Sequence, residues 1–426
     1  MAEIPMVFIL AGLVGYTVLA GADFGAGLWT LLAGGGRAGR AATRDHARHA
    51  MGPVWEANHV WLILVLVVLW TSYPVAFGSI MSTLAIPLFI AAVGIILRGV
   101  SYALRGQLEG ARGQHPIENL FALSSILTPF ALGTVVGGIA SGRVPVGNAA
   151  GDPLTSWLNP TSVVLGALAV AISGYLAAVY LAADAHRLGE RILEQDFRAR
   201  ALASGLCAGA LALAGLFVVR FDAPALFQGL TSDGGLAMVV VSAAAGLMTL
   251  FLVWRNRFGP ARASAALAVA AIVAGWALAQ RPLLLPGLTI DQAAASRSTL
   301  LAVIVAVACG GAVLIPSLLL LFRLFLRGRF DPVTTPDPAV FPPPHTAQRE
   351  KTRLLPAFAA TTFLVGVGVT VIAGGGWARV LGIICLFACA ISTFTLATAQ
   401  PYEFKTASSS PNAASADHPS PVTARD

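Results

Sequence analysis

Charged side chains are scarce in this chain of 426 residues. Asp, Glu, Lys and Arg make up 11% of it, whereas a soluble domain carries roughly a quarter. Hydrophobic residues account for 57%. This composition excludes a soluble globular domain and predicts a polytopic membrane protein of the all-α class.

Cysteine is also rare, and the four cysteines all stand in apolar segments. None has the spacing of a zinc site or of a haem-attachment motif. Cys385 and Cys389 are four residues apart, and we interpret them as small buried residues rather than metal ligands. The N-terminus has no basic region of a cleaved signal peptide, so we expect the first helix to remain in the mature protein.

The basic residues give a formal net charge of +7. They stand in short runs between apolar segments, and this pattern argues against nucleic-acid binding. It favours the lipid headgroups of the inner leaflet as their partner.

Apolar runs of about 20 residues predict eleven membrane helices. They lie near residues 6–33, 53–76, 79–104, 117–140, 160–184, 200–219, 235–254, 262–280, 299–325, 354–373 and 378–399. Of the 27 Lys and Arg residues, 21 fall in one set of alternate connections and the C-terminal tail, five fall in the other set, and Arg98 remains inside a helix. We therefore expect the N-terminus outside and the C-terminus in the cytoplasm.

A proline-rich stretch separates the first nine helices from the last two. We expect a nine-helix body over 1–330, a cytoplasmic Pro-rich linker over 331–353, a two-helix membrane appendage over 354–400 and a disordered cytoplasmic tail over 401–426.

Three ionisable residues fall in the first three predicted helices: Asp23, Glu56 and Arg98. The predicted orientation places all of them in the cytoplasmic half of the membrane. An ionisable residue in a spanning helix is costly and is a candidate functional site. One interpretation is a structural ion pair, with Arg98 bridging the two carboxylates. The other is a proton entry site in which Glu56 changes charge.

Trp55, Asn58 and Trp61 accompany Glu56 in the second helix. The tryptophans suit either membrane-interface anchors or contacts with a quinone, and Asn58 needs a polar partner. His59 is the only histidine that the sequence places in a helix core, with the other six assigned to loops or tails. We therefore expect any haem to be held by a partner chain.

Several motifs resemble those of subunit II of the cytochrome bd-type quinol oxidases. The strongest are in residues 21–25 (GADFG), 52–63 (GPVWEANHVWLI), 73–74 (YP) and 98–100 (RGV), and weaker ones are in 158–160 and 295–299. The resemblance covers about residues 1–328.

The resemblance implies nine helices in two four-helix bundles plus a peripheral helix, in a bacterial cytoplasmic membrane. It also implies a haem-free subunit that pairs with subunit I, which holds two haems b, haem d and the quinol-oxidising loop. Such a complex oxidises quinol, reduces oxygen to water and is electrogenic without pumping. The resemblance then implies that Glu56 begins a cytoplasmic proton path, with Asp23 and Arg98 nearby. It leaves open whether this subunit binds a structural quinone.

The sequence departs from the family pattern at a few places. Glu56 stands where Asp is more frequent, and residues 101–105 keep Tyr102 and Arg105 but lack an acid. Residues 64–69 replace a glycine-rich segment, and the appendage is extra. We hypothesise that the appendage occupies a surface that small single-helix accessory subunits cover in other members.

Two alternatives remain at this level. One is an ion-coupled secondary transporter that uses Asp23, Glu56 and Arg98, although the matching pair of interrupted helices typical of such transporters is not evident. The other is a purely structural assembly factor, which needs no titrating acid.

Overall fold

The computed structural model describes the main chain of residues 1–33, 36–51, 55–105, 111–326 and 355–372, with short pieces between 377 and 392. Side chains are described for these residues except in 48–57, 102–119, 321–326 and 355–356 and at some positions from 367 onward. The chain divides into two units, Met1–Arg327 and Gly328–Asp426. The predicted linker 331–353, the tail 401–426 and much of the predicted helix 378–399 lie outside the described residues.

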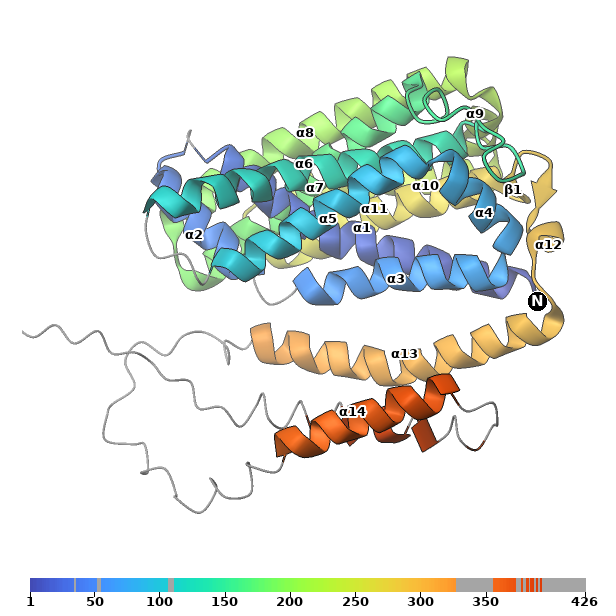
Figure 1. Ribbon diagram of the computed structural model, residues 1–426. Coiled ribbons are helices and arrows are strands. Elements are labelled where there is room, and N and C mark those ends of the chain that lie inside the picture. The colour runs from blue at the N-terminus through green and yellow to red at the C-terminus, as the bar shows by residue number, and fades with distance from the viewer. Residues whose placement is uncertain are drawn as a thin grey trace, which may run out of the picture. The chain divides into compact units, whose positions relative to one another are not determined.

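Unit 1 is built almost entirely from helices (Figure 1). Their bounds are α1 Glu3–Leu31, α2 Gly39–Met51, α3 Trp55–Ser72, α4 Pro74–Thr83, α5 Ala85–Arg105, α6 Ala111–Ala140, α7 Pro160–Leu188, α8 Arg191–Asp222, α9 Pro224–Thr231, α10 Asp233–Trp254, α11 Phe258–Gln280, α12 Ile290–Ala293 and α13 Arg297–Leu326. Among the described residues, seven helices are long and apolar enough to cross a membrane, or eight if α4 and α5 form one span. A polytopic helical membrane protein is therefore confirmed, while the nine-helix count and the two four-helix bundles stay predictions.

The second and third predicted helices are wrong where they meet. The helix expected over 53–76 ends at Ser72, and the one expected over 79–104 is broken into α4 and α5, which are bent by 82°. Pro74 is the first residue of α4, a position where its missing N–H costs nothing. Pro87 has no N–H to donate to the carbonyl of Thr83, and the break between α4 and α5 falls where this bond would be missing from a continuous helix.

The basic segment after α1 was expected to be a loop and is instead a helix, α2. This corrects the assignment of His46, which is buried in α2 and hydrogen-bonded through Nε2 to the Leu181 carbonyl at 3.0 Å. Arg44 of α2 donates to the carbonyl of Thr30 at 3.2 Å, at the last turn of α1. A short helix with a charged face contains no long apolar run, so a search for such runs does not find it.

The loops at the opposite end of the bundle hold two further features. Asn159 caps α7 by accepting the Ser162 N–H at 2.9 Å, and Pro160 follows it, which confirms the expected start of that helix. Residues 281–298, expected to be a polar loop, contain a small antiparallel hairpin of β1 Leu283–Leu285 and β2 Leu288–Thr289.

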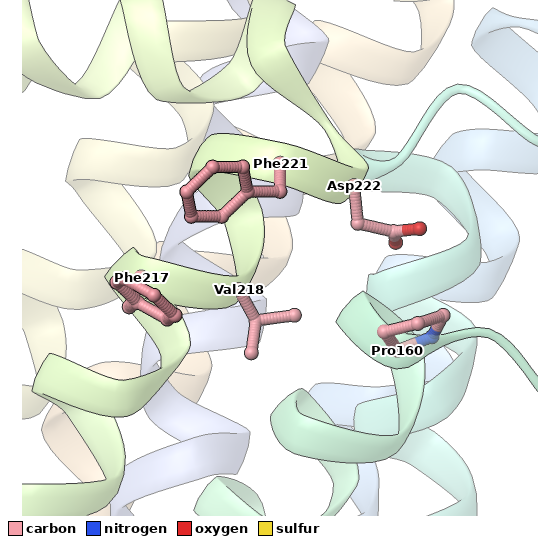
Figure 2. Close-up of a pocket in the computed structure, with 5 residues that line it drawn as sticks. All are labelled: Pro160, Phe217, Val218, Phe221 and Asp222. Atoms are coloured by element: carbon pink, nitrogen blue, oxygen red, sulfur yellow. The ribbon is translucent and has the colours of Figure 1, made fainter.

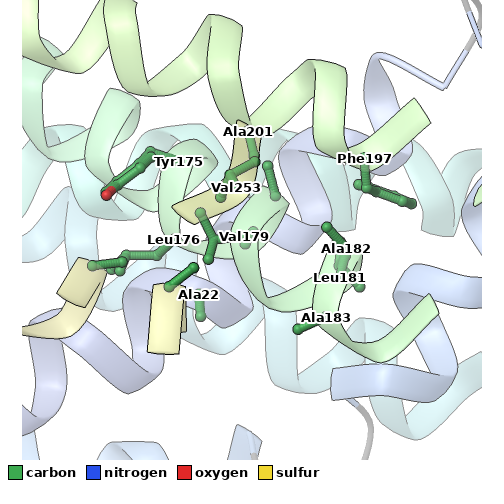
Figure 3. Packing of buried hydrophobic residues seen from close by; sticks show 14 of the residues in the cluster. Ala22, Tyr175, Leu176, Val179, Leu181, Ala182, Ala183, Phe197, Ala201 and Val253 are labelled. Carbon is green, nitrogen blue, oxygen red and sulfur yellow. The ribbon is translucent and has the colours of Figure 1, made fainter. Parts of the chain in front are cut away.

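Helix α7 lies at the centre of unit 1 and contacts α1, α6, α8 and α11. Figure 3 shows the resulting core, in which Leu176 and Val179 of α7 pack with Ala22 of α1, Ala201 of α8 and Val253 of α10. Small side chains on the neighbouring helices permit this close packing. The core holds α1 in the position from which Asp23 is presented.

Unit 2 contains α14, Leu355–Ile372, which agrees with the helix expected over 354–373. Its described apolar part, Ala357–Gly366, is shorter than a full membrane span.

Candidate functional site

Asp23 of α1 and Arg98 of α5 form an ion pair inside unit 1. Nη2 of Arg98 lies 2.7 Å from Oδ1 of Asp23, and Nε donates to Oδ2 at 3.0 Å. Nη2 also donates to the carbonyl oxygen of Asp23 at 2.7 Å. Arg98 is 0% exposed and Asp23 is 2% exposed. The two-bond geometry is the strongest that arginine makes with a carboxylate, and it confirms that these two residues meet.

The other side of the guanidinium is held by α6. Nη1 of Arg98 donates to Ser125 Oγ at 2.7 Å, and Ser125 in turn donates to the Phe121 carbonyl at 2.7 Å. The rings of Phe24 and Phe121 lie 4.8 Å and 4.2 Å from Cζ of Arg98, within the range of a cation–π interaction. A single side chain therefore joins α1, α5 and α6.

Two glycines after Asp23 allow its helix to approach its neighbours. A Cβ at Gly25 would overlap the carbonyl oxygen of Ser173 in α7, and one at Gly27 would overlap Ser125 Oγ in α6. Gly25 of the GADFG motif therefore lets α1 approach α7, and Gly27 lets α1 approach Ser125, which also binds Arg98.

Glu56 lies in the first turn of α3, directly after Trp55. The side chains of both residues are outside the described part of the structure, so the expected meeting of Glu56 with Asp23 and Arg98 stays a prediction. The structure brings together two of the three predicted ionisable residues.

Trp61 and Asn58 face the inside of the chain. Trp61 is half-buried and packs on α1 at Gly15, beside Tyr16, Ala20 and Phe24. Asn58 is 1% exposed. Trp61 therefore serves helix packing, and the expected quinone contact of Trp55, Asn58 and Trp61 stays a prediction.

Sequence reasoning did not assign a role to Ser125 or to Phe121. A hydroxyl in an apolar segment is a weak signal, because serine often donates to the carbonyl four residues earlier in its own helix. Ser125 does so here and accepts from Arg98 at the same time. Only the packing of α5 against α6 distinguishes it from its neighbour Ser124, which donates to Phe121 and is equally buried.

Metal-ligating side chains are scattered over the described residues. No group of three or more His, Cys, Asp or Glu side chains that could hold a metal ion occurs among them. The ring of His46 is packed beside Phe197, with centroids 5.6 Å apart, and its Nε2 is engaged with a carbonyl. His46 therefore does not offer this nitrogen to iron.

A groove lies far from the ion pair, at the junction of α7 and α8. It is lined by Pro160, Phe217, Val218, Phe221 and Asp222 (Figure 2). Pro160 precedes Ser173, the neighbour of Gly25, by thirteen residues, or about 20 Å of helix.

Asp222, at the end of this groove, belongs to a polar clamp. Its two carboxylate oxygens accept bonds of 2.9 and 2.7 Å from Arg143, which raise the pKa of that guanidinium, and Thr161 donates through both N–H and hydroxyl. With these donors the carboxylate joins the ends of α7 and α8 to the loop after α6.

Comparison with known proteins gives a family and a fold. Residues 1–325 match the family described as cytochrome bd terminal oxidase subunit II. The cytochrome bd ubiquinol oxidase subunit 2 of Bacillus subtilis is 28% identical over 130 residues, which are 30% of this chain and 37% of that protein. The cytochrome bd-I ubiquinol oxidase subunit 2 of Escherichia coli K12 is 24% identical over 220 residues, 49% of this chain and 54% of that one.

The matched stretches thus span about half or less of these relatives. A chain in the structure of the bd oxidase from Geobacillus thermodenitrificans has the same fold, with a TM-score of 0.59 at 13% identity over 76% of this chain and 98% of that one. From the match over its first 325 residues, this chain belongs to the cytochrome bd terminal oxidase subunit II family.

Proposed function

We propose that this chain is the haem-free subunit II of a bd-type terminal oxidase in a bacterial cytoplasmic membrane. It forms a heterodimer with a subunit I that carries two haems b and haem d. The complex oxidises quinol and reduces oxygen to water. Family membership favours this function over an ion-coupled transporter.

The observation that carries the proposal is the buried Asp23–Arg98 pair. Both carboxylate oxygens of Asp23 accept bonds from the guanidinium, so protonation of Asp23 would remove the charge that pairs with buried Arg98. The pair is therefore a fixed arrangement of charge rather than a carrier. Glu56, at the start of α3, is the remaining acid of the three and is the group that we propose exchanges protons.

The direction of proton entry follows from the charge bias of the loops. With the basic connections in the cytoplasm, the start of α3 faces the inner compartment. Protons that enter there and electrons from quinol oxidised at the outer face together build a membrane potential without a pump. The haems of subunit I, when bound, supply the electron transfer and the oxygen chemistry.

Co-purification tests the assignment most simply. The tagged full-length chain is expressed with its native neighbours, and a reduced-minus-oxidised spectrum is recorded on the purified material. We expect haem b and haem d signals with a second large subunit present. A chain that purifies without haem from cells with an active oxidase would contradict the proposal.

A further inference from the structure

Asn58 carries an amide that the surrounding helices do not satisfy. Its Oδ1 and Nδ2 find no hydrogen-bond partner among the described residues. The residue is only 1% exposed although no partner chain is present. A partner small enough to be enclosed between the helices, such as water, can therefore supply the missing bonds.

Tyr16 of α1 has the same property. Its hydroxyl is buried without a partner among the described residues, and the whole residue is 7% exposed. The Tyr16 ring lies 6.3 Å from the ring of His59, the residue next to Asn58. The charges of Asp23 and Arg98 both act on Tyr16, so the hydroxyl lies in the field of the ion pair.

The antiparallel register of α1 and α3 places these groups at similar depth. Gly12 faces Val65 and Gly15 faces Trp61. Asn58 lies about one turn before Trp61 in α3, at the level of Val18 in α1. This position is less than one turn, or about 5 Å, from Tyr16 and little more than one turn from Asp23.

Leaving these polar atoms without hydrogen bonds destabilises the folded chain. An unpaired buried polar group costs about 1–3 kcal/mol, and Asn58 and Tyr16 together contain three such atoms. Buried water commonly satisfies such groups by making two to four hydrogen bonds of its own. The amide of Asn58 provides a donor and an acceptor, and the hydroxyl of Tyr16 provides a third group. Together they can bind one or two water molecules.

We propose that Asn58 and Tyr16 hold bound water between α1 and α3, beside the Asp23–Arg98 pair. The water donates to Oδ1 of Asn58, accepts from Nδ2 and bonds the Tyr16 hydroxyl. It hydrates the side of α1 that carries Asp23. This hydration site goes beyond the proposed function, because it exists whether or not Glu56 conducts protons.

Radiolytic hydroxyl labelling of the purified complex, read by mass spectrometry, tests the site. X-ray pulses generate hydroxyl radicals from bound water, which label side chains next to it. We expect several-fold more labelling at Tyr16 than at Tyr73, which is 0% exposed and whose hydroxyl already donates to the Ala2 carbonyl. Labelling of Tyr16 no greater than that of Tyr73 overturns the proposal.

Two variants with opposite effects sharpen the test. Asn58→Leu fills the site and removes the amide, so labelling of Tyr16 should fall to the level of Tyr73. Asn58→Ala leaves room for water, so labelling should be kept or increased. Ser72→Ala removes another buried, unpartnered hydroxyl from α3 and should leave Tyr16 unchanged.

Retained labelling in Asn58→Leu, or reduced labelling in Asn58→Ala, overturns the proposal. If Asn58→Leu does not assemble, the wild-type and Asn58→Ala measurements still decide. The readout needs no turnover, so it is independent of the outcome for Glu56.

Discussion

Arg98 is a charged side chain with no exposed surface, and four polar contacts and two aromatic rings surround it. Removing such a charge from water costs several kcal/mol, and only a complete set of partners offsets that cost. Asp23 supplies the opposite charge, and Ser125 supplies a neutral acceptor. The pair is therefore sensitive to loss of either member.

We predict that Arg98→Leu destabilises the chain by about 3–5 kcal/mol, because it leaves the Asp23 carboxylate buried without its main partner. The double variant Asp23→Leu/Arg98→Leu should recover much of that loss. Thermal unfolding and the yield of assembled complex measure both. Equal losses in the single and double variants would contradict a structural coupling between the two residues.

At the residue scale, the cost of charge in a membrane was enough to identify Asp23 and Arg98 from the sequence. Hydropathy predicts their depth in the membrane, and a similar depth on neighbouring helices predicts that they meet. The sequence could not identify Ser125, because the packing of α5 on α6 decides which hydroxyl turns toward the guanidinium. Nor could it show that Asn58 is closed off from every surface of the chain.

Among the elements, α1 is held by contacts that only glycine permits. Gly25→Ala should destabilise the chain by about 1–3 kcal/mol, because its Cβ meets the backbone of Ser173, which cannot rotate away. Gly209→Ala in α8 is the matched control. No atom lies within 4 Å of its added Cβ, so it should be neutral or stabilising by up to about 1 kcal/mol.

Thermal unfolding of the purified complex compares the two glycine variants. A Gly25→Ala protein as stable as Gly209→Ala would show that α1 and α7 are not held as closely as described.

Most elements follow from apolar runs, and the exceptions have local causes. The break between α4 and α5 falls inside a largely apolar run, so hydropathy alone joins the two helices. Helix α2 is polar on one side, so a search for apolar runs predicts a loop there. Helix α8 begins nine residues before the apolar segment because residues 191–199 contain no helix-breaking proline or glycine.

For the whole molecule, unit 1 contains its own hydrophobic cores and should fold without the rest of the chain. Truncation after Arg327 tests the hypothesis that the appendage replaces accessory subunits. We expect the truncated chain to bind subunit I, with reduced complex yield or oxygen consumption. Unchanged assembly and oxygen consumption would count against an accessory role.

Composition, charge bias and a few motifs were sufficient for the class, the family and most of the helices. They could not give the number of spans, because the bend between α4 and α5 changes how an apolar run crosses the membrane. They also do not decide between a structural and a proton-carrying role, since both need the same three residues. That difference lies in whether one acid changes its charge during turnover.

Oxygen consumption by the complex of subunits I and II with Glu56→Gln tests this claim most directly, alongside proton uptake from the inner side of proteoliposomes. Glu3→Gln is the control, because Glu3 is an exposed acid paired with Arg281 at the start of α1. We predict slower oxygen reduction and proton uptake in Glu56→Gln at unchanged haem content, with normal rates in Glu3→Gln. Wild-type rates in Glu56→Gln would contradict the proton role, and loss of haem would indicate a structural one.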